Sequence, residues 1–159
     1  MKKLRISKTN ALTPKTSAVR KVTKSPQALL VVDDNYLPAL TQLLNHASKS
    51  VDIIAYSFAI GRAAGFYSKK GAPFRIAEQL IALKKKWKAK IKIRLYLEGE
   101  RDTAERNRLT GDYLKKAGID VRYGSTHAKG FCIDDSLVLF GSTNLTNQSI
   151  TKNIGLVMK

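Results

Sequence analysis

The segment 127–144 gathers side chains that can attack, bind and neutralise an anion within 18 residues. His127 and Lys129 are two positions apart, so on a strand their side chains point to the same face. A nucleophile or proton carrier would then lie beside a fixed positive charge, which suits a phosphate. Ser142 and Asn144 are also two positions apart and follow a glycine that permits a tight turn. They can present a hydroxyl and an amide to the same anion.

The complete spacing is His127-x-Lys129-x4-Asp134-x6-Gly-Ser142-x-Asn144. It resembles the signature H-x-K-x4-D-x6-G-S-x-N of the phospholipase D superfamily, and every fixed position matches. The active site of that superfamily resembles a pair of such motifs that face each other across a pseudo-twofold axis. This chain has one copy, so it is similar to the small single-motif members, which build one site from two identical chains. The resemblance therefore implies a homodimer.

The resemblance implies a catalytic set of His127, Lys129, Asp134, Ser142 and Asn144. Neutral His127 would attack phosphorus and form a phosphohistidine, and a second, protonated histidine would act as general acid and then as base. Lys129, Ser142 and Asn144 would bind the phosphate oxygens, where fixed donors stabilise the developing charge. Asp134 is expected to orient the end of the strand through hydrogen bonds to local backbone rather than to act as an acid.

The chain departs from the family at one position. Members commonly carry a glutamate about eleven residues after the asparagine, and it hydrogen-bonds the histidine ring; here that position is Gly155. Glu98, at the end of an expected strand, is a candidate substitute carboxylate. Because of this departure, a catalytically weak nucleic-acid-binding module remains an alternative to an enzyme.

The charge points to a polyanionic partner. The formal net charge is +17, and residues 1–25 hold eight Lys or Arg and no acid, which leaves 21 basic and 12 acidic residues in the rest of the chain. We expect a flexible basic arm over residues 1–26 and a catalytic domain over residues 27–159. Nucleic acid fits this charge best and an anionic membrane surface fits second, but charge alone does not choose between them. A nuclease that acts on DNA or RNA is the first hypothesis, and a phospholipase or phosphatidyl-transferase is the second.

Two segments are candidate nucleic-acid contacts. The loop 59–72 interleaves aromatic and basic residues, which suits stacked bases over a neutralised backbone, although its aromatic residues could equally dock on the core. The run 84–94 holds seven basic residues, some of which can offset a helix dipole instead of binding phosphate. The candidates are Arg62, Phe66, Tyr67, Lys69, Lys70, Lys84, Lys85 and Lys86.

Other features exclude some classes of protein. The single cysteine, Cys132, cannot form an internal disulfide and is expected to be a small buried residue, and His46 is expected on a helix surface. No cluster has metal-ligand spacing, so we expect no metal and no cofactor. The sequence has neither an apolar run of 18 residues nor the apolar core of a secretory signal, so we expect a cytoplasmic protein. The basic arm leaves organellar targeting open.

Hydrophobic periodicity predicts alternating strands and helices. Strands are expected at 28–32 (a buried strand), 51–58, 91–97 and 119–123, and helices at 36–47, from Pro73 to about residue 87, and at 103–117. Asp34 and Asn35 are candidate N-caps for the first helix. The motif strand and two closing strands follow. This order predicts an α/β domain with a mixed, mainly parallel β-sheet flanked by helices on both faces, which is the phospholipase D-like fold.

Overall fold

The computed structural model describes residues 28–61, 71–150 and 154–158. It contains seven strands in this part of the chain: β1 (Ala28–Val32), β2 (Ser50–Ala55), β3 (Lys92–Glu98), β4 (Asp120–Gly124), β5 (Lys129–Ile133), β6 (Leu137–Gly141) and β7 (Ile154–Met158). Its α-helices are α1 (Tyr36–His46), α2 (Ala72–Trp87), α3 (Ala104–Lys115) and α4 (Asn147–Ile150), and two short 3-10 helices are η1 (Asp33–Asn35) and η2 (Lys88–Lys90). The predicted helices and strands therefore form close to their expected bounds.

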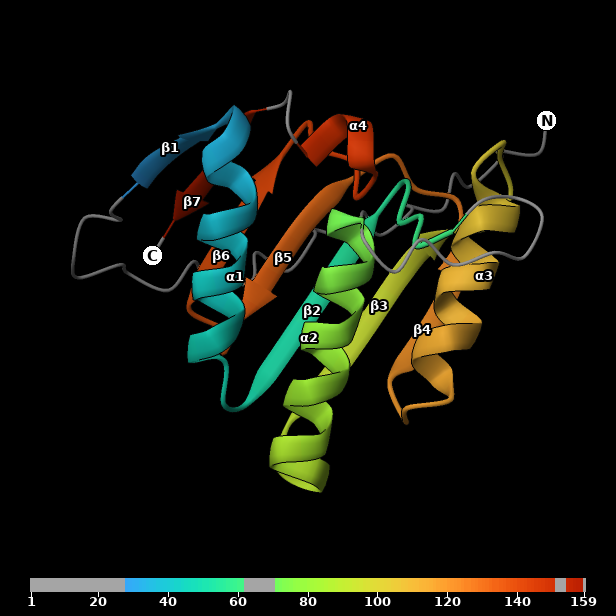
Figure 1. Ribbon diagram of the computed structural model, residues 1–159, viewed down its shortest axis with the longest axis horizontal. Helices are drawn as coiled ribbons and strands as arrows, with labels where there is room; N and C mark the ends of the chain where they lie inside the picture. Colours follow the sequence, from blue (N-terminus) through green and yellow to red (C-terminus); the bar gives the residue numbers. More distant parts are fainter. Residues whose placement is uncertain (1–27, 62–70, 151–153, 159) are drawn as a thin grey trace, which may run out of the picture.

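The strands form one mixed sheet in the order β1-β7-β6-β5-β2-β3-β4 (Figure 1). The prediction of a mixed α/β fold is confirmed, but the expectation of mainly parallel pairing is wrong. Only β2 with β3 and β3 with β4 are parallel, and the other four described pairings are antiparallel. The reason lies in the connections: parallel neighbours need a crossover of a dozen or more residues, whereas β5 and β6 are joined by a tight turn.

That turn has a clear local cause. Asp134 and Asp135 both have positive φ angles, 53° and 55°, and the amide of Ser136 donates to the carbonyl of Ile133 at 3.1 Å. Two central residues with positive φ define a type I′ turn, whose twist matches that of a hairpin, and aspartate tolerates this conformation better than most residues. The β5–β6 hairpin is thus encoded by the two consecutive aspartates.

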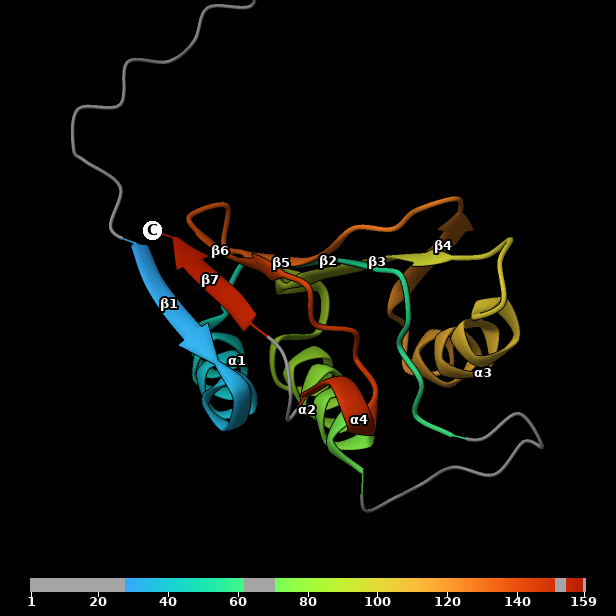
Figure 2. The ribbon, with the colours of Figure 1, turned by 90° about the horizontal axis from the view of Figure 1, so that it is seen from above.

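The four described α-helices all lie on one face of the sheet, as Figure 2 shows. The expectation of helices on both faces is therefore wrong for the part of the chain that the structure describes. Buried side chains of α1 and α2, such as Leu40, Leu44 and Leu80, pack there against the inward residues of β2 and β3. The opposite, open face carries partly exposed apolar side chains, among them Val138 and Phe140, because no described helix covers them.

Two local expectations at the start of the domain also need correction. β1 is an edge strand in which only Val31 is buried, so it is not the buried strand that its continuous apolar run indicated. Asn35 makes no side-chain capping hydrogen bond to α1, because residues 33–35 form a 3-10 turn that leads into the helix. No helix among the described residues is long and apolar enough to cross a membrane.

The sheet has two ends that matter for function. At one end of the strands, β2 and β3 finish and β5 begins; we call this the Glu98 end. At the opposite end, β2 and β3 begin and β5 finishes; we call this the Lys92 end. The helices α2 and α3 run back from the Glu98 end to the Lys92 end, since each connects the end of one parallel strand to the start of the next.

Candidate active site

His127 and Lys129 lie at the Glu98 end, where the chain enters β5. Ala55 of β2 is paired with Lys129, and the amide of Tyr56 donates to the carbonyl of Ala128 at 3.0 Å, so β2 holds this segment in register. The Lys129 Nζ lies 3.5 Å from Nδ1 of His127 and donates to the His127 carbonyl at 2.7 Å. The predicted neighbourhood of an imidazole and an ammonium group is therefore present in the structure. Partial burial of Lys129 lowers the pKa of its ammonium group.

Tyr56 supports both candidate catalytic side chains, and the sequence analysis missed it. Its ring centroid lies 4.5 Å from that of His127, and the Lys129 Nζ lies 5.0 Å from the Tyr56 ring centroid. The Tyr56 hydroxyl donates to the Asp102 carboxylate at 2.6 Å. This hydrogen bond is the largest cause of a raised pKa of Tyr56, so the hydroxyl stays protonated as the pH rises. The tyrosine ring, tilted by 51° to the imidazole, can therefore restrict the orientation of His127.

Glu98 is buried at the end of β3 and holds the backbone just before His127. Its carboxylate accepts hydrogen bonds from the amides of Thr126, at 2.6 Å, and of Glu100 and Arg101, at 2.8 and 3.1 Å. The bond from Thr126 is the largest cause of a lowered pKa of Glu98. The Glu98 carboxylate therefore contacts the backbone just before His127. Its hydrogen bonds in the described structure go to backbone amides and not to the imidazole ring.

Asn107 of α3 ties the ends of β2 and β3 together beneath this segment. The side chain is completely buried; its Nδ2 donates to the carbonyls of Tyr56 and Glu98, both at 2.8 Å, and its Oδ1 accepts from the amide of Phe58 at 2.8 Å. Buried polar groups with a full set of partners rigidify their surroundings. Asn107 therefore fixes the strand ends that carry the candidate site.

The segment after β6 brings the second half of the motif to the same end of the sheet. The amide of Leu145 donates to the carbonyl of Ser57 at 2.8 Å, and the amide of Ala59 donates to the carbonyl of Leu145 at 3.0 Å. Asn144 therefore lies beside the end of β2, and β2 also pairs with the segment that leads from His127 into β5. Asn144 Oδ1 and the adjacent Thr143 Oγ1 are buried without a hydrogen-bond partner among the described residues. Ser142 is exposed one residue further back.

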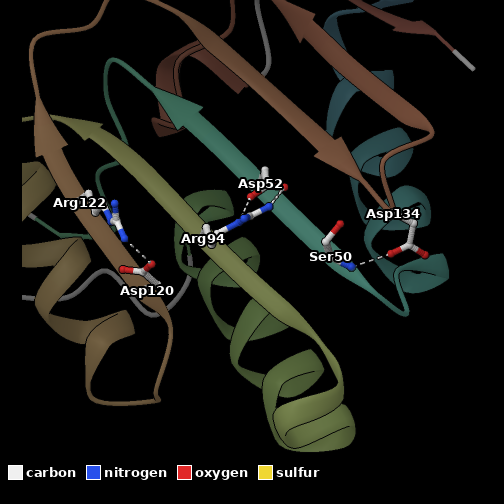
Figure 3. Close-up of polar contacts among 6 residues, drawn as sticks. All are labelled: Ser50, Asp52, Arg94, Asp120, Arg122 and Asp134. Carbon is white, nitrogen blue, oxygen red and sulfur yellow. Dashed lines mark hydrogen bonds and ion pairs between the residues drawn. The ribbon is translucent and has the colours of Figure 1, made fainter. Parts of the chain in front are cut away.

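Asp134 lies at the Lys92 end, at the opposite end of β5 from His127. Figure 3 shows its carboxylate directed at the start of β2. It accepts hydrogen bonds from the amides of Ser48 (3.0 Å), Lys49 (2.7 Å) and Ser50 (2.9 Å), and from the Ser48 hydroxyl at 3.0 Å. The geometry gives Asp134 the orienting contacts that were expected of it, but with a backbone segment distant in sequence rather than with its own turn.

The burial of Asp134 and its hydrogen bonds act on its pKa in opposite directions. Desolvation raises the pKa of the carboxyl, whereas the bonds from the amides of Ser50, Lys49 and Ser48 lower it, and the net result is a pKa below the ordinary value. The ionised form is therefore the one that the α1–β2 connection binds.

Gly155 faces the helical side of the sheet, opposite Gly141 of β6. A Cβ atom placed there would lie 3.0 Å from the ring of Tyr36 and 3.2 Å from Leu139. Tyr36 is 3 % exposed, so its buried ring occupies the space into which a side chain at position 155 would project. A glutamate at this position would need the tyrosine to shift, which gives a physical reason for the departure from the family pattern.

The candidate nucleic-acid contacts fall into two groups. Arg62, Phe66, Tyr67, Lys69 and Lys70 lie outside the described residues. Lys84, Lys85 and Lys86 form the last turn of α2, at the Lys92 end and away from His127. Lys84 donates to the carbonyl of Ile91 at 3.3 Å and thereby connects α2 to the start of β3, whereas Lys85 and Lys86 are exposed.

The remaining histidine and the cysteine lie apart from the candidate site. His46 is exposed at the end of α1, and its Nδ1 lies 2.8 Å from the carbonyl oxygen of Gln42. Cys132 is partly exposed on the open face of the sheet rather than buried in the core, because it alternates with the inward residues Phe131 and Ile133. Within the described ranges, no group of three or more His, Cys, Asp or Glu residues could hold a metal ion.

Comparison with known proteins agrees with this architecture. Residues 40–159 match the family model described as "Cardiolipin synthase, PLD-like domain", and the chain therefore belongs to the phospholipase D-like family. A search of curated protein sequences found no match.

Solved structures share the fold. Nuc, a phospholipase D family member from Salmonella typhimurium, is 20% identical with a TM-score of 0.65, and the match covers 84% of this chain and 83% of that one. NucT from Helicobacter pylori is 20% identical with a TM-score of 0.64, covering 84% and 86%. TrmBL2, an archaeal chromatin protein with a novel mode of DNA binding, is 12% identical with a TM-score of 0.53, covering 84% of this chain and 46% of that chain.

Proposed function

We propose that this protein is a phosphodiesterase, and specifically a metal-independent nuclease of low sequence preference that acts on DNA or RNA through a phosphohistidine on His127. The observation that carries the proposal is the placement of His127 beside the Lys129 ammonium group, 3.5 Å from Nδ1 to Nζ, against the ring of Tyr56. Superfamily members hydrolyse or transfer phosphodiesters. Every residue of their signature is present in the chain, with His127, Lys129, Ser142 and Asn144 at this end of the sheet and Asp134 at the opposite end.

In the proposed reaction, an imidazole nitrogen of His127 attacks phosphorus while the bond from phosphorus to the leaving alcohol breaks. The alcohol takes a proton from a second, protonated histidine. Water then attacks the phosphohistidine and gives a proton to that second histidine, which releases a phosphate monoester and restores neutral His127. Lys129 and the donors of Ser142 and Asn144 would stabilise the negative charge that develops on the phosphoryl oxygens.

The second histidine requires a second copy of the motif, so we propose a symmetric homodimer in which His127 of the partner subunit supplies the acid. His46 cannot serve, because it lies at the end of α1, at the Lys92 end of the sheet. The unpaired buried Oδ1 of Asn144 supports an incomplete site, since buried polar atoms normally have partners.

Nucleic acid is favoured as the substrate by the net charge of +17. The DNA-binding activity named for TrmBL2, which has a similar fold, agrees with this choice. The competing candidate is a phospholipid, because the matching family model is described as cardiolipin synthase. A protein that works at a membrane is expected to present a wide apolar helix face. The exposed large apolar side chains of the described residues lie on strands instead.

The proposal is tested by incubating the protein in EDTA with single-stranded DNA, double-stranded DNA, RNA and phosphatidylcholine vesicles, each with a His127→Ala control. Cleavage of nucleic acid in EDTA that is absent from the variant is the expected result. Release of choline without nucleic-acid cleavage would favour the phospholipase. Binding of nucleic acid with no cleavage of any substrate would favour the catalytically weak binding module.

The dimer is tested by sedimentation and by mixing. Wild-type chains mixed with an excess of His127→Ala chains should form heterodimers with little turnover, because each heterodimer has only one of the two histidines. A monomer with full activity would contradict the dimeric site.

A further inference from the structure

The lysines of the described chain concentrate at the Lys92 end of the sheet, away from His127. Three connections converge there: the one before β2, the one between α2 and β3, and the one between α3 and β4. Gly118, after α3, lies beside α2, because a Cβ atom on it would be 3.9 Å from the Lys84 side chain. The lysines at this end are Lys49, Lys84, Lys85, Lys86, Lys88, Lys90, Lys92, Lys115 and Lys116.

Acidic side chains offset only part of the charge at this end. Asp134 and Asp135 lie here in the turn between β5 and β6, and the Asp134 carboxylate accepts hydrogen bonds from three backbone amides. Asp52 pairs with Arg94, with 2.7 Å between its Oδ2 and the arginine Nη2, and Asp120 pairs with Arg122 at 3.7 Å (Figure 3). Neither of these two ion pairs involves a lysine.

Two of the exposed lysines have no structural partner among the described residues. Lys90 and Lys92 are exposed, and neither side chain makes a hydrogen bond or an ion pair within the described structure. Such a collection of like charges costs folding energy through repulsion unless a polyanion or salt screens it. The Lys92 end therefore has the electrostatic character of a surface that binds an anionic polymer.

The two ends of the sheet are about as far apart as six base pairs of a DNA duplex. From Lys92 to Glu98 the strand β3 advances six residues, which is about 20 Å at ~3.3 Å per residue. Duplex DNA advances ~3.4 Å per base pair along each strand, so about six base pairs cover the same distance. A duplex cleaved at the Glu98 end is therefore long enough to contact the Lys92 end once it extends about six base pairs beyond the scissile phosphate.

We propose that the Lys92 end is a second nucleic-acid-binding surface, which anchors the backbone of a long substrate about six base pairs from the point of cleavage. The inference rests on the proposed function for the position of the scissile phosphate. It adds a substrate class: extended nucleic acid is bound at both ends of the sheet, and a small phosphodiester only at one.

A membrane is the less suitable partner for this surface. Membrane-binding surfaces combine basic residues with apolar side chains that enter the lipid. The exposed large apolar residues of the described chain, which include Leu30, Val138 and Phe140, belong to strands β1, β2, β3 and β6, and none lies in α2, η2 or the end of α3. The elements that carry most of these lysines are thus basic and present no large exposed apolar side chain, although Val138 at the start of β6 lies at the same end of the sheet.

The test compares two charge-matched double variants of the full chain. Lys90→Gln/Lys92→Gln removes two charges from the Lys92 end, and Arg75→Gln/Arg106→Gln removes two from the first turns of α2 and α3, at the Glu98 end. Binding of a 24-base-pair duplex, about 80 Å long, is measured against salt concentration with His127→Ala added to each protein, so that no cleavage intervenes. Hydrolysis of bis(p-nitrophenyl) phosphate, which is too small to reach both ends, is measured with His127 intact.

The lysine variant should lower the log–log salt slope by about 1.8, at ~0.9 for each lost phosphate contact, and the arginine variant reports the effect of losing two charges at the Glu98 end. Hydrolysis of the small phosphodiester by the lysine variant should match that of the wild type. An unchanged slope in the lysine variant would overturn the proposed surface. So would a loss of binding to phosphatidylglycerol vesicles with an unchanged DNA slope, because that result would assign the surface to a membrane.

The two proposals fail separately in this experiment. A wild-type protein that hydrolyses no phosphodiester, but whose DNA slope still depends on the two lysines, would contradict the nuclease and leave the surface supported. Cleavage of both substrates with a slope independent of the lysines would contradict the surface alone.

Discussion

Replacement of Asp134 by asparagine separates a structural from a catalytic role for the aspartate of the motif. Asparagine is the suitable change because it also tolerates the positive φ of 53° at this position. Its single carbonyl oxygen can still accept from the amides of Lys49 and Ser50, but its amino group meets the donors of Ser48. The variant therefore loses the bonds to Ser48 and weakens the other two, which become neutral.

The magnitude follows from these bonds. A hydrogen bond to a charged group contributes about 1.5–3 kcal/mol and a neutral one about 0.5–1.5 kcal/mol. At the lower ends of these ranges, weakening two bonds by about 1 kcal/mol each and losing two bonds from Ser48 of about 1.5 kcal/mol each sums to about 5 kcal/mol, which solvent exposure reduces to about 2 kcal/mol. For a chain of this size that loss lowers the melting temperature by about 4–8 °C.

The assay is thermal unfolding together with turnover per folded molecule, with Asp135→Asn as the matched control. Asp135 has the same charge and a similar φ of 55°, but it is exposed and makes no side-chain hydrogen bond to β2. Asp134→Asn should lower the melting temperature and keep its turnover, while Asp135→Asn changes neither. Loss of turnover with an unchanged melting temperature would refute the structural assignment.

The same carboxylate gives a pH signature. Its pKa is lowered in the folded state, so its stabilisation is present above the unfolded pKa of about 3.9 and is lost as pH falls through the folded pKa. The difference in stability between wild type and Asp134→Asn should therefore be full near pH 6 and shrink progressively below about pH 5. A difference that is constant down to pH 2 would show that the charge of Asp134 is not the cause.

Three further perturbations address the site and the arm. Lys129→Ala should lower kcat by about 10²–10³-fold with an unchanged melting temperature, since it removes the fixed charge beside the phosphate, and near-normal turnover at saturating substrate would contradict that role. Tyr56→Leu should reduce kcat and broaden the pH profile of kcat, because the ring against His127 is lost. Tyr56→Phe keeps the ring and should retain most of the activity. Equal loss of activity in both variants would assign the effect to the hydrogen bond with Asp102. Deletion of residues 1–25 should weaken nucleic-acid affinity and flatten its salt dependence by about 0.7–0.9 for each lost contact, with turnover of a short oligonucleotide preserved; loss of turnover at unchanged affinity would assign the arm to the fold or the dimer.

The elements were predictable from the sequence because their signals are local. Apolar residues at helical spacing predicted α1 and α2, and the alternation of apolar and polar residues in β3 predicted a strand with one buried face. The pairing directions were harder, since they depend on connections. The consecutive aspartates 134 and 135 were the available sign in the sequence of a hairpin with antiparallel strands, because aspartate tolerates the positive φ angles that the turn adopts. β1 read as buried because a continuous apolar run does not distinguish a central strand from an edge.

The candidate site was predictable only in part. His127 and Lys129 belong to one motif segment that leads into β5, so their neighbourhood follows from local information. Tyr56 and Glu98 come from other strands, and they approach His127 only because β5 lies beside β2 and β2 beside β3. Tyr56 gave no signal in the sequence, whereas Glu98 was a candidate because it ends an expected strand. Position 155 is explained by packing, because Tyr36 fills its space from α1.

The central claim is that His127 attacks phosphorus. Rapid acid-free quenching of the protein during turnover of an oligonucleotide in EDTA, followed by mass spectrometry of the peptide that contains residues 127–129, tests it most directly. The account predicts a phosphoryl-linked nucleotide adduct on His127 that forms and decays within one turnover and that is absent from His127→Ala. Undiminished cleavage by His127→Ala, or turnover of the wild type with the adduct on another residue, would contradict it.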